Sequence, residues 1–139
     1  MAEQTFNLQI MTPMGAFYQK PAQRIIVTTT EGEMGILPGH EPTTAILNIG
    51  AIDMLGDQGE TKTAVVTGGF IVVSEDEGVR IFADTAEWPE DIDIARAIAA
   101  KERAERRLQE KAADVNMARA EAALRRALIR IEVGQKSHK

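Results

Sequence analysis

The chain has 139 residues, a formal net charge of −5 and no cysteine, which excludes disulfides and thiolate metal sites. No stretch approaches the roughly 20 apolar residues that span a bilayer, so the sequence predicts no direct insertion into a membrane. A sequence pI near 5.1 and an aromatic content of 4% argue against a partner made of nucleic acid.

Short alternating runs fill the first part of the chain. Phe6, Leu8 and Ile10 alternate with polar residues, which is the period of a half-buried strand. Many short strands at regular spacing indicate a β-sandwich or a barrel. The strands that we predict begin at Phe6 and continue over residues 24–30, 51–55, 61–67, 70–74 and 78–83, with turns between them.

The composition changes abruptly at Trp88 and Pro89. Ten of the 11 glycines precede residue 89. Residues 1–88 carry 12 acids and four bases, net −8, whereas residues 89–139 carry nine acids and 12 bases, net +3. We therefore predict an α+β protein with a strand-rich domain over residues 1–88 and a helical domain over residues 89–139.

The sequence of residues 89–139 predicts an antiparallel helical hairpin. Pro89 suits a first helical turn, and one helix is expected to run to about Lys111. Asp114 is the expected cap of a second helix that stops near Gly134. The joint has neither glycine nor proline, and alanines dominate the interface, so we expect weak packing and a switchable appendage. The apolar stripe expected on the second helix is Met117, Ala120, Leu124, Leu128 and Ile131.

Arginines repeat with the same offsets in both predicted helices. The second and third members of each set fall within roughly 20° of the first on a helical wheel, and the set lies roughly opposite the apolar positions. This favours solvated faces, with Glu102–Arg106 and Glu121–Arg125 pairs, although the stripes also suit an anionic ligand or an acidic partner surface. The two sets are Arg96, Arg103 and Arg107, and Arg119, Arg126 and Arg130.

The sequence EGEMGILPGHEP at residues 31–42 predicts a rigid, structured loop. Neither a phosphate-binding loop nor a dinucleotide fingerprint fits its glycine spacing. His40 next to Glu41 is compatible with a general base or a metal ligand, but the other histidine, His138, lies near the end of the chain. We therefore favour a backbone bond or a partner contact for His40 and predict no metal site.

Several uncommon motifs occur together and in order between about Phe6 and Ile131. They are EGEMGILPGHEP, a turn expected at residues 67–70, residues 83–86 and DIDIARA at residues 91–97. Together they resemble the epsilon subunit of the F-type ATP synthase, of the bacterial type. The resemblance implies an N-terminal β-sandwich on the rotating central stalk and a C-terminal hairpin that moves between compact and extended forms.

Site residues follow from the resemblance position by position. Glu33 and His40 match interface positions that face the c-ring and the gamma subunit. Ile92, Asp93, Arg96 and Ala97 match the family's ATP-binding signature, although an Asp93–Arg96 pair on one helix face explains the spacing equally well. The remaining positions that the resemblance associates with nucleotide are Glu87, Arg103, Arg119 and Arg126.

The resemblance implies a non-catalytic rotor subunit of a proton- or sodium-translocating synthase, with no catalytic residue of its own. It would couple rotation to ATP synthesis and restrain ATP hydrolysis through the hairpin. No cofactor is obligatory, and ATP is the expected regulatory ligand. The expected partners are the gamma subunit and the c-ring, with the alpha and beta subunits when the hairpin extends. The expected place is the cytoplasmic face of the bacterial plasma membrane, or the stromal side of a thylakoid.

Two other functions stay open at this point. A free-standing ATP-binding sensor would use the same hairpin without any rotary machine. A hydrolase built on Glu87, Asp93 or His40 has little support, because no second histidine or metal set accompanies these residues.

Overall fold

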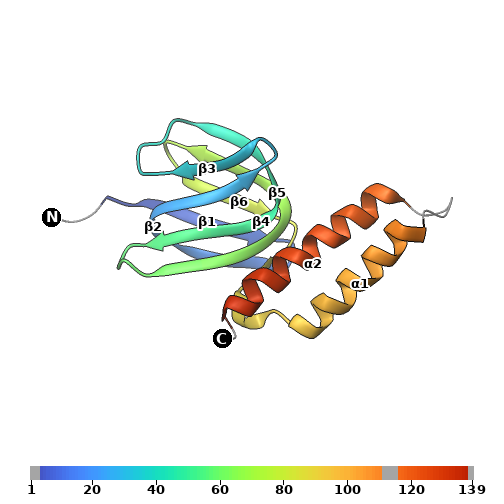
Figure 1. Ribbon diagram of the computed structural model, residues 1–139. Helices are drawn as coiled ribbons and strands as arrows, with labels where there is room; N and C mark the ends of the chain where they lie inside the picture. The colour runs from blue at the N-terminus through green and yellow to red at the C-terminus, as the bar shows by residue number, and fades with distance from the viewer. Residues whose placement is uncertain (1–3, 111–115, 138–139) are drawn as a thin grey trace. The chain divides into compact units, whose positions relative to one another are not determined.

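The computed structural model describes residues 4–110 and 116–137. Its internal contacts divide the chain into two compact units, Met1–Ala86 and Glu87–Lys139. The first unit is built from strands and the second from helices, as Figure 1 shows. The predicted α+β class, with strands first and a two-helix hairpin after them, is therefore confirmed.

The strands of the first unit form one sheet that closes on itself. The sheet order is β1-β6-β5-β4-β2-β3, and β1 also pairs with β2, so five strands complete a circuit and β3 is added at an edge. β1 and β6 are parallel, whereas the other pairs of that circuit and β2–β3 are antiparallel. The strands are β1 (Phe6–Thr12), β2 (Gly15–Thr29), β3 (Gly32–Ile36), β4 (Thr43–Gly56), β5 (Thr61–Ser74), β6 (Gly78–Ala83) and β7 (Ala86–Glu87).

The core of this unit comes from one face of each strand. Leu8 and Ile10 are almost fully buried, as the alternating pattern of the first strand predicted. Ile71 of β5 and Ile81 of β6 are register partners and are both fully buried. Aliphatic side chains from facing strands thus fill the closed sheet, and their burial is the main favourable contribution to its stability.

Three of the strands are longer than the sequence predicted. β2 begins at Gly15 rather than at residue 24, and β4 begins at Thr43 rather than at residue 51. The turn expected at residues 67–70 is wrong, because Gly68 and Gly69 lie inside the continuous strand β5. Both have positive φ, 118° and 127°, so these glycines bend a strand instead of ending it.

The segment at residues 31–42 is only partly a loop. Gly32–Ile36 forms the edge strand β3, which pairs with β2, so the prediction of a loop throughout is wrong. The following turn closes with the His40 N–H donating to the carbonyl of Leu37 at 3.1 Å. Pro38 and Gly39 occupy its central positions, and the positive φ of Gly39, 83°, suits this tight reversal.

The helical unit begins differently from the prediction. Pro89–Asp91 forms a short 3-10 helix, η1, and the first α-helix, α1 (Ile94–Glu110), starts after it. Asp93 is the N-cap of α1, because its carboxylate accepts the N–H of Arg96 at 3.0 Å. The side-chain pair between Asp93 and Arg96, one of the two explanations offered for their spacing, is therefore corrected: the carboxylate binds the Arg96 backbone.

The second helix, α2 (Met117–Ser137), is capped by Asn116, whose side-chain oxygen accepts the N–H of Arg119 at 3.1 Å. The cap predicted at Asp114 lies outside the described residues. The stop predicted at Gly134 is wrong, because α2 continues through it. A Cβ at this position would lie 3.2 Å from side-chain carbons of both Ile92 and Ile94. Glycine here permits close packing rather than a helix end.

The two helices lie side by side and antiparallel, and alanines form much of their interface (Figure 1). Ala97 and Ala104 of α1 are buried, as are Ala120 and Ala127 of α2. The expected alanine-rich interface is confirmed.

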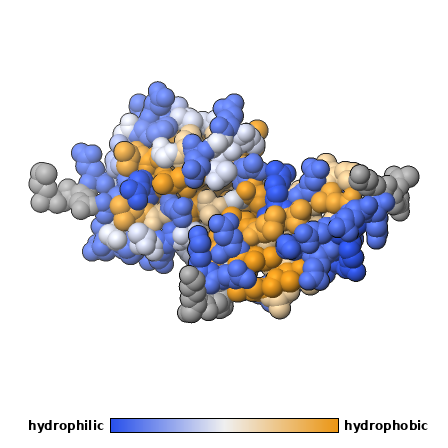
Figure 2. Space-filling model, viewed as in Figure 1, coloured by the Kyte–Doolittle hydropathy of each residue, from blue (hydrophilic) through white to orange (hydrophobic). Residues whose placement is uncertain are grey.

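The apolar stripe predicted for α2 is only partly correct, because Met117 and Leu128 remain 36% and 43% exposed. Figure 2 shows hydrophobic residues gathered along the hairpin between hydrophilic margins. Within the described chain, neither helix is both long enough and apolar enough to cross a bilayer.

Candidate functional site: a cationic groove in the helical hairpin

A groove of about 470 Å³ lies within the helical unit. This volume is in the range of roughly 300–1,000 Å³ that is typical of small-molecule sites. α1, α2 and the segment before α1 all contribute to it. The groove is lined by Glu87, Asp91, Ile92, Asp93, Arg96, Ala97, Ala100, Arg103, Ala123, Arg126, Ala127 and Arg130.

Small side chains line the middle of the groove. Ala97 and Ala100 come from α1, and Ala123 and Ala127 come from α2. Each pair is spaced by three or four residues, so both members lie on the helix face that meets the other helix. Methyl groups at these positions leave a hollow that longer side chains would fill. The alanines that weaken the helix contact therefore also create the space.

Four arginines line this hollow, and their charges are only partly compensated. Arg130 donates through Nε to a Glu87 carboxylate oxygen at 2.6 Å. In the described part of the chain, the guanidinium groups of Arg96, Arg103 and Arg126 have no carboxylate within 4.0 Å. Three cationic groups therefore border the groove without an ion-pair partner there.

The arginine stripes are thus placed differently from the prediction. They do not lie opposite the packed faces of the helices: Arg96 and Arg126 immediately precede the buried Ala97 and Ala127 at the groove. Arg107 and Arg119 are not among its lining residues. In the described parts of α1 and α2, the i, i+4 ion pairs are Lys101–Glu105 and Lys136–Glu132 rather than the two that we predicted.

The groove gathers almost all the positions that the resemblance associates with nucleotide. Glu87, Ile92, Asp93, Arg96, Ala97, Arg103 and Arg126 line it together. Arg119 does not; it lies in the first turn of α2, where its backbone N–H donates to the cap residue Asn116. The sequence also placed Arg130 in a cationic stripe but not in the site. Its i, i+4 spacing from Arg126 was the signal that could have identified it.

The groove is suited to binding an anion with a flat or polar group attached. Guanidinium groups donate forked hydrogen bonds that match phosphate oxygens. The half-buried Ala100 and Ala123 supply apolar surface, and Asp91 supplies a carboxylate that can accept from an amine or hydroxyl. Across the described residues, no three histidine or carboxylate side chains gather into a metal-binding group.

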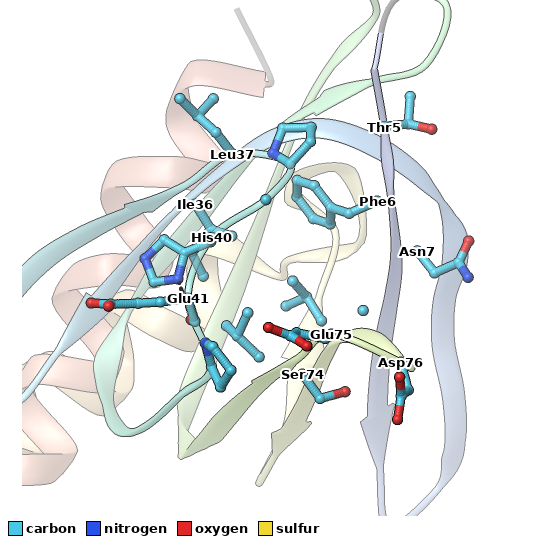
Figure 3. A pocket seen from close by; sticks show the side chains of 16 residues that line it. Thr5, Phe6, Asn7, Ile36, Leu37, His40, Glu41, Ser74, Glu75 and Asp76 are labelled. Atoms are coloured by element: carbon cyan, nitrogen blue, oxygen red, sulfur yellow. Dashed lines mark hydrogen bonds between the residues drawn. The ribbon is translucent and has the colours of Figure 1, made fainter.

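The two positions predicted to contact partners lie on the strand unit. Glu33 is exposed on β3, opposite Thr28 of β2. His40 lines a second hollow of about 610 Å³, and its Nδ1 lies 2.8 Å from the carbonyl oxygen of Glu41. Figure 3 shows His40 and Glu41 on one side of this hollow and Ser74 with Glu75 on another. The two predicted contact residues therefore do not share one pocket.

Comparison with known proteins divides the chain within a few residues of the same place. Residues 5–89 match the beta-sandwich domain of the ATP synthase delta/epsilon chain, and residues 90–135 match its long alpha-helix domain. The ATP synthase epsilon chain of Caldanaerobacter subterraneus is 48% identical over 96% of both chains. The epsilon chain of Syntrophomonas wolfei is 43% identical over 98% of both.

A solved structure is also similar. A chain in the mitochondrial ATP synthase of Euglena gracilis, in an assembly of OSCP, F1 and c-ring, aligns with a TM-score of 0.81 and 27% identity. The alignment covers 96% of this chain and 81% of that one. The chain therefore belongs to the delta/epsilon chain family of the ATP synthase. Within that family it belongs with the epsilon subunits of the bacterial F-type enzyme.

Proposed function

We propose that this chain is a central-stalk subunit whose strand unit binds the gamma subunit and the c-ring, and whose helical unit restrains ATP hydrolysis. The similar Euglena chain comes from an assembly that contains the F1 sector and the c-ring. In this proposal the chain works as a peripheral component on the cytoplasmic face of the plasma membrane. Exposed Glu33 on β3 and His40 beside the second hollow are the proposed contact residues.

We further propose that the groove of the hairpin binds ATP and that binding favours the compact form. The observation that carries this proposal is the convergence of Arg96, Arg103 and Arg126 on one hollow, without ion-pair partners among the described residues. Like charges on the two helices repel each other across an empty groove. A polyphosphate would replace this repulsion with attraction, so it would hold the helices together.

Release of the hairpin would expose a long cationic element. Two helices joined into one rod of about 40 residues would reach roughly 60 Å. Such a rod could contact acidic surfaces of the alpha and beta subunits and oppose rotation. In this account low ATP favours the extended, restraining form, and high ATP favours the compact, permissive form.

Removal of the helical unit tests the regulatory part of this proposal. A chain ending at residue 88 keeps the whole closed sheet, so it should still assemble with gamma and the c-ring. ATP hydrolysis by the reconstituted enzyme should rise severalfold at low ATP concentration, relative to enzyme with the full chain. Equal hydrolysis rates with normal assembly would contradict a restraining role, and failed assembly would contradict the assignment of partner binding to the strand unit.

A further inference from the structure

The pair formed by Glu87 and Arg130 differs from the other ion pairs of the helical unit. Lys101–Glu105 and Lys136–Glu132 each join neighbouring turns of one helix, at 3.3 and 3.9 Å. Glu87–Arg130 is shorter, 2.6 Å, and joins residues that are 43 positions apart. It connects α2 to the segment that precedes η1, at the end of the hairpin opposite the joint. An opening that carries this end of α2 away from the segment before η1 would break it.

Near this ion pair, the backbone of α2 at Gly134 comes close to the chain at the start of α1. Gly134 lies one turn beyond Arg130 on the same face of α2. The position where its Cβ would be is only 3.2 Å from Ile92 and Ile94. The C-terminal end of α2 therefore packs closely against the start of α1. Elsewhere the interface consists largely of alanine methyl groups, which bury less apolar area than larger side chains do.

The arginine charges around the Glu87–Arg130 pair determine how much this ion pair contributes to closure of the hairpin. Arg130 is one of four arginines on the groove, and the other three, which have no ion-pair partner among the described residues, repel one another when no anion is present. The Glu87 carboxylate compensates one of these charges within the protein itself. The side chains of Glu87 and Arg130 are 31% and 28% exposed, so water screens their attraction only partly.

We propose that Glu87 and Arg130 form a latch, one helical turn from the close contact at Gly134, that holds the hairpin compact without any nucleotide. The inference rests on the proposed opening of the hairpin. It adds a regulation of that motion that depends on the protein's own charges rather than on ATP. In this account the latch contributes to closure in the absence of nucleotide, and both of its residues also line the groove. Loss of the latch raises the open population even when the groove is empty.

A distance measurement on the full chain tests the latch. The protein has no cysteine, so Glu102→Cys on α1 and Glu121→Cys on α2 provide two exposed sites for spin labels. Pulsed electron paramagnetic resonance then gives the open fraction without nucleotide. Glu87→Gln and Arg130→Gln should each raise the open-to-closed ratio about two- to fivefold, as expected for a partly exposed ion pair. The open-to-closed ratio of the double variant should be close to that of either single variant, because each substitution removes the same interaction.

Two further variants keep the result interpretable. Glu105→Gln breaks an ion pair within α1, so it should leave the open fraction unchanged. The charge swap Glu87→Arg with Arg130→Glu should restore closure toward that of the unsubstituted chain. Single variants that leave the open fraction unchanged, or effects that simply add in the double variant, would overturn the latch.

The same labelled proteins distinguish the latch from the proposed nucleotide site. Addition of ATP to the chain without latch substitutions should lower the open fraction further. If ATP has no effect but the latch variants open the hairpin, the latch stands and nucleotide control fails. If ATP closes the hairpin but the latch variants match the unsubstituted chain, nucleotide control stands and the latch fails.

Discussion

Replacing Arg103 and Arg126 together by alanine should weaken ATP binding about 100-fold or more. Both guanidinium groups line the groove, one from each helix, and neither has an ion-pair partner in the described residues. A hydrogen bond to a charged group contributes about 1.5–3 kcal/mol, so two lost contacts exceed the roughly 2.7 kcal/mol that corresponds to 100-fold. Calorimetric titration of ATP into the full-length chain measures this change.

The matched control removes two positive charges from the same helices but outside the groove. Arg107→Ala with Arg119→Ala should change the ATP affinity by less than about threefold, because long-range attraction is screened by salt. This control also separates two expectations about Arg119. The family resemblance associates it with nucleotide, whereas the structure leaves it out of the groove lining. Equal losses in the two double variants would contradict our assignment of the site.

Gly69→Ala should destabilise the strand unit by about 3–5 kcal/mol. The φ of Gly69 is 127°, which alanine rarely adopts, and an added Cβ would overlap the carbonyl oxygen of Phe82. Backbone strain and a forced shift of β6 each cost about 1–3 kcal/mol. Urea denaturation followed by circular dichroism measures the free energy of unfolding.

Gly35→Ala is the control for this strand substitution. Gly35 lies on the edge strand β3, has no positive φ and has nothing within 4 Å of an added Cβ. Its substitution should change the unfolding free energy by less than about 1 kcal/mol. A similarly small loss for Gly69→Ala would mean that β5 and β6 can separate locally at little cost, against the tight pairing described above.

The fold class follows from the sequence because period and composition change together at residue 88. Alternation predicted the buried face of β1 correctly, and the run of helix-forming residues predicted two helices. The lengths of the strands were not predicted from the sequence. Gly68 and Gly69 read as a turn in a single sequence, because the signal for a bend inside a strand is the same as the signal for its end.

A glycine also caused the error in the predicted end of the second helix. Gly134 resembles a helix stop, and only the positions of Ile92 and Ile94 reveal that it permits close contact. Likewise Asp93 reads as a helical partner of Arg96, whereas its carboxylate caps α1. In each case a residue that is distant in sequence, or a backbone group, decides the outcome. Local propensity cannot report either of these.

The sequence predicted most of the residues that line the site but not how they are arranged in space. The resemblance named seven positions that line the groove: Glu87, Ile92, Asp93, Arg96, Ala97, Arg103 and Arg126. Periodicity put the arginines opposite the apolar positions, because it counted Leu128 with Ala120 on the packed face of α2. Ala120 and Ala127 are buried whereas Leu128 is 43% exposed, so the packed face lies closer to the arginines than predicted. The pairing of Arg130 with Glu87 needed the structure, because 43 residues separate them.

The most direct test of our central proposal is an ATP titration of the full-length, isotopically labelled chain followed by backbone nuclear magnetic resonance. We expect saturable shifts of the amides at residues 91–103 and 123–130, which border the groove. The amides at residues 31–42 on the strand unit should stay unchanged. The absence of shifts up to millimolar ATP, or saturable shifts confined to the strand unit, would contradict a nucleotide site in the helical hairpin.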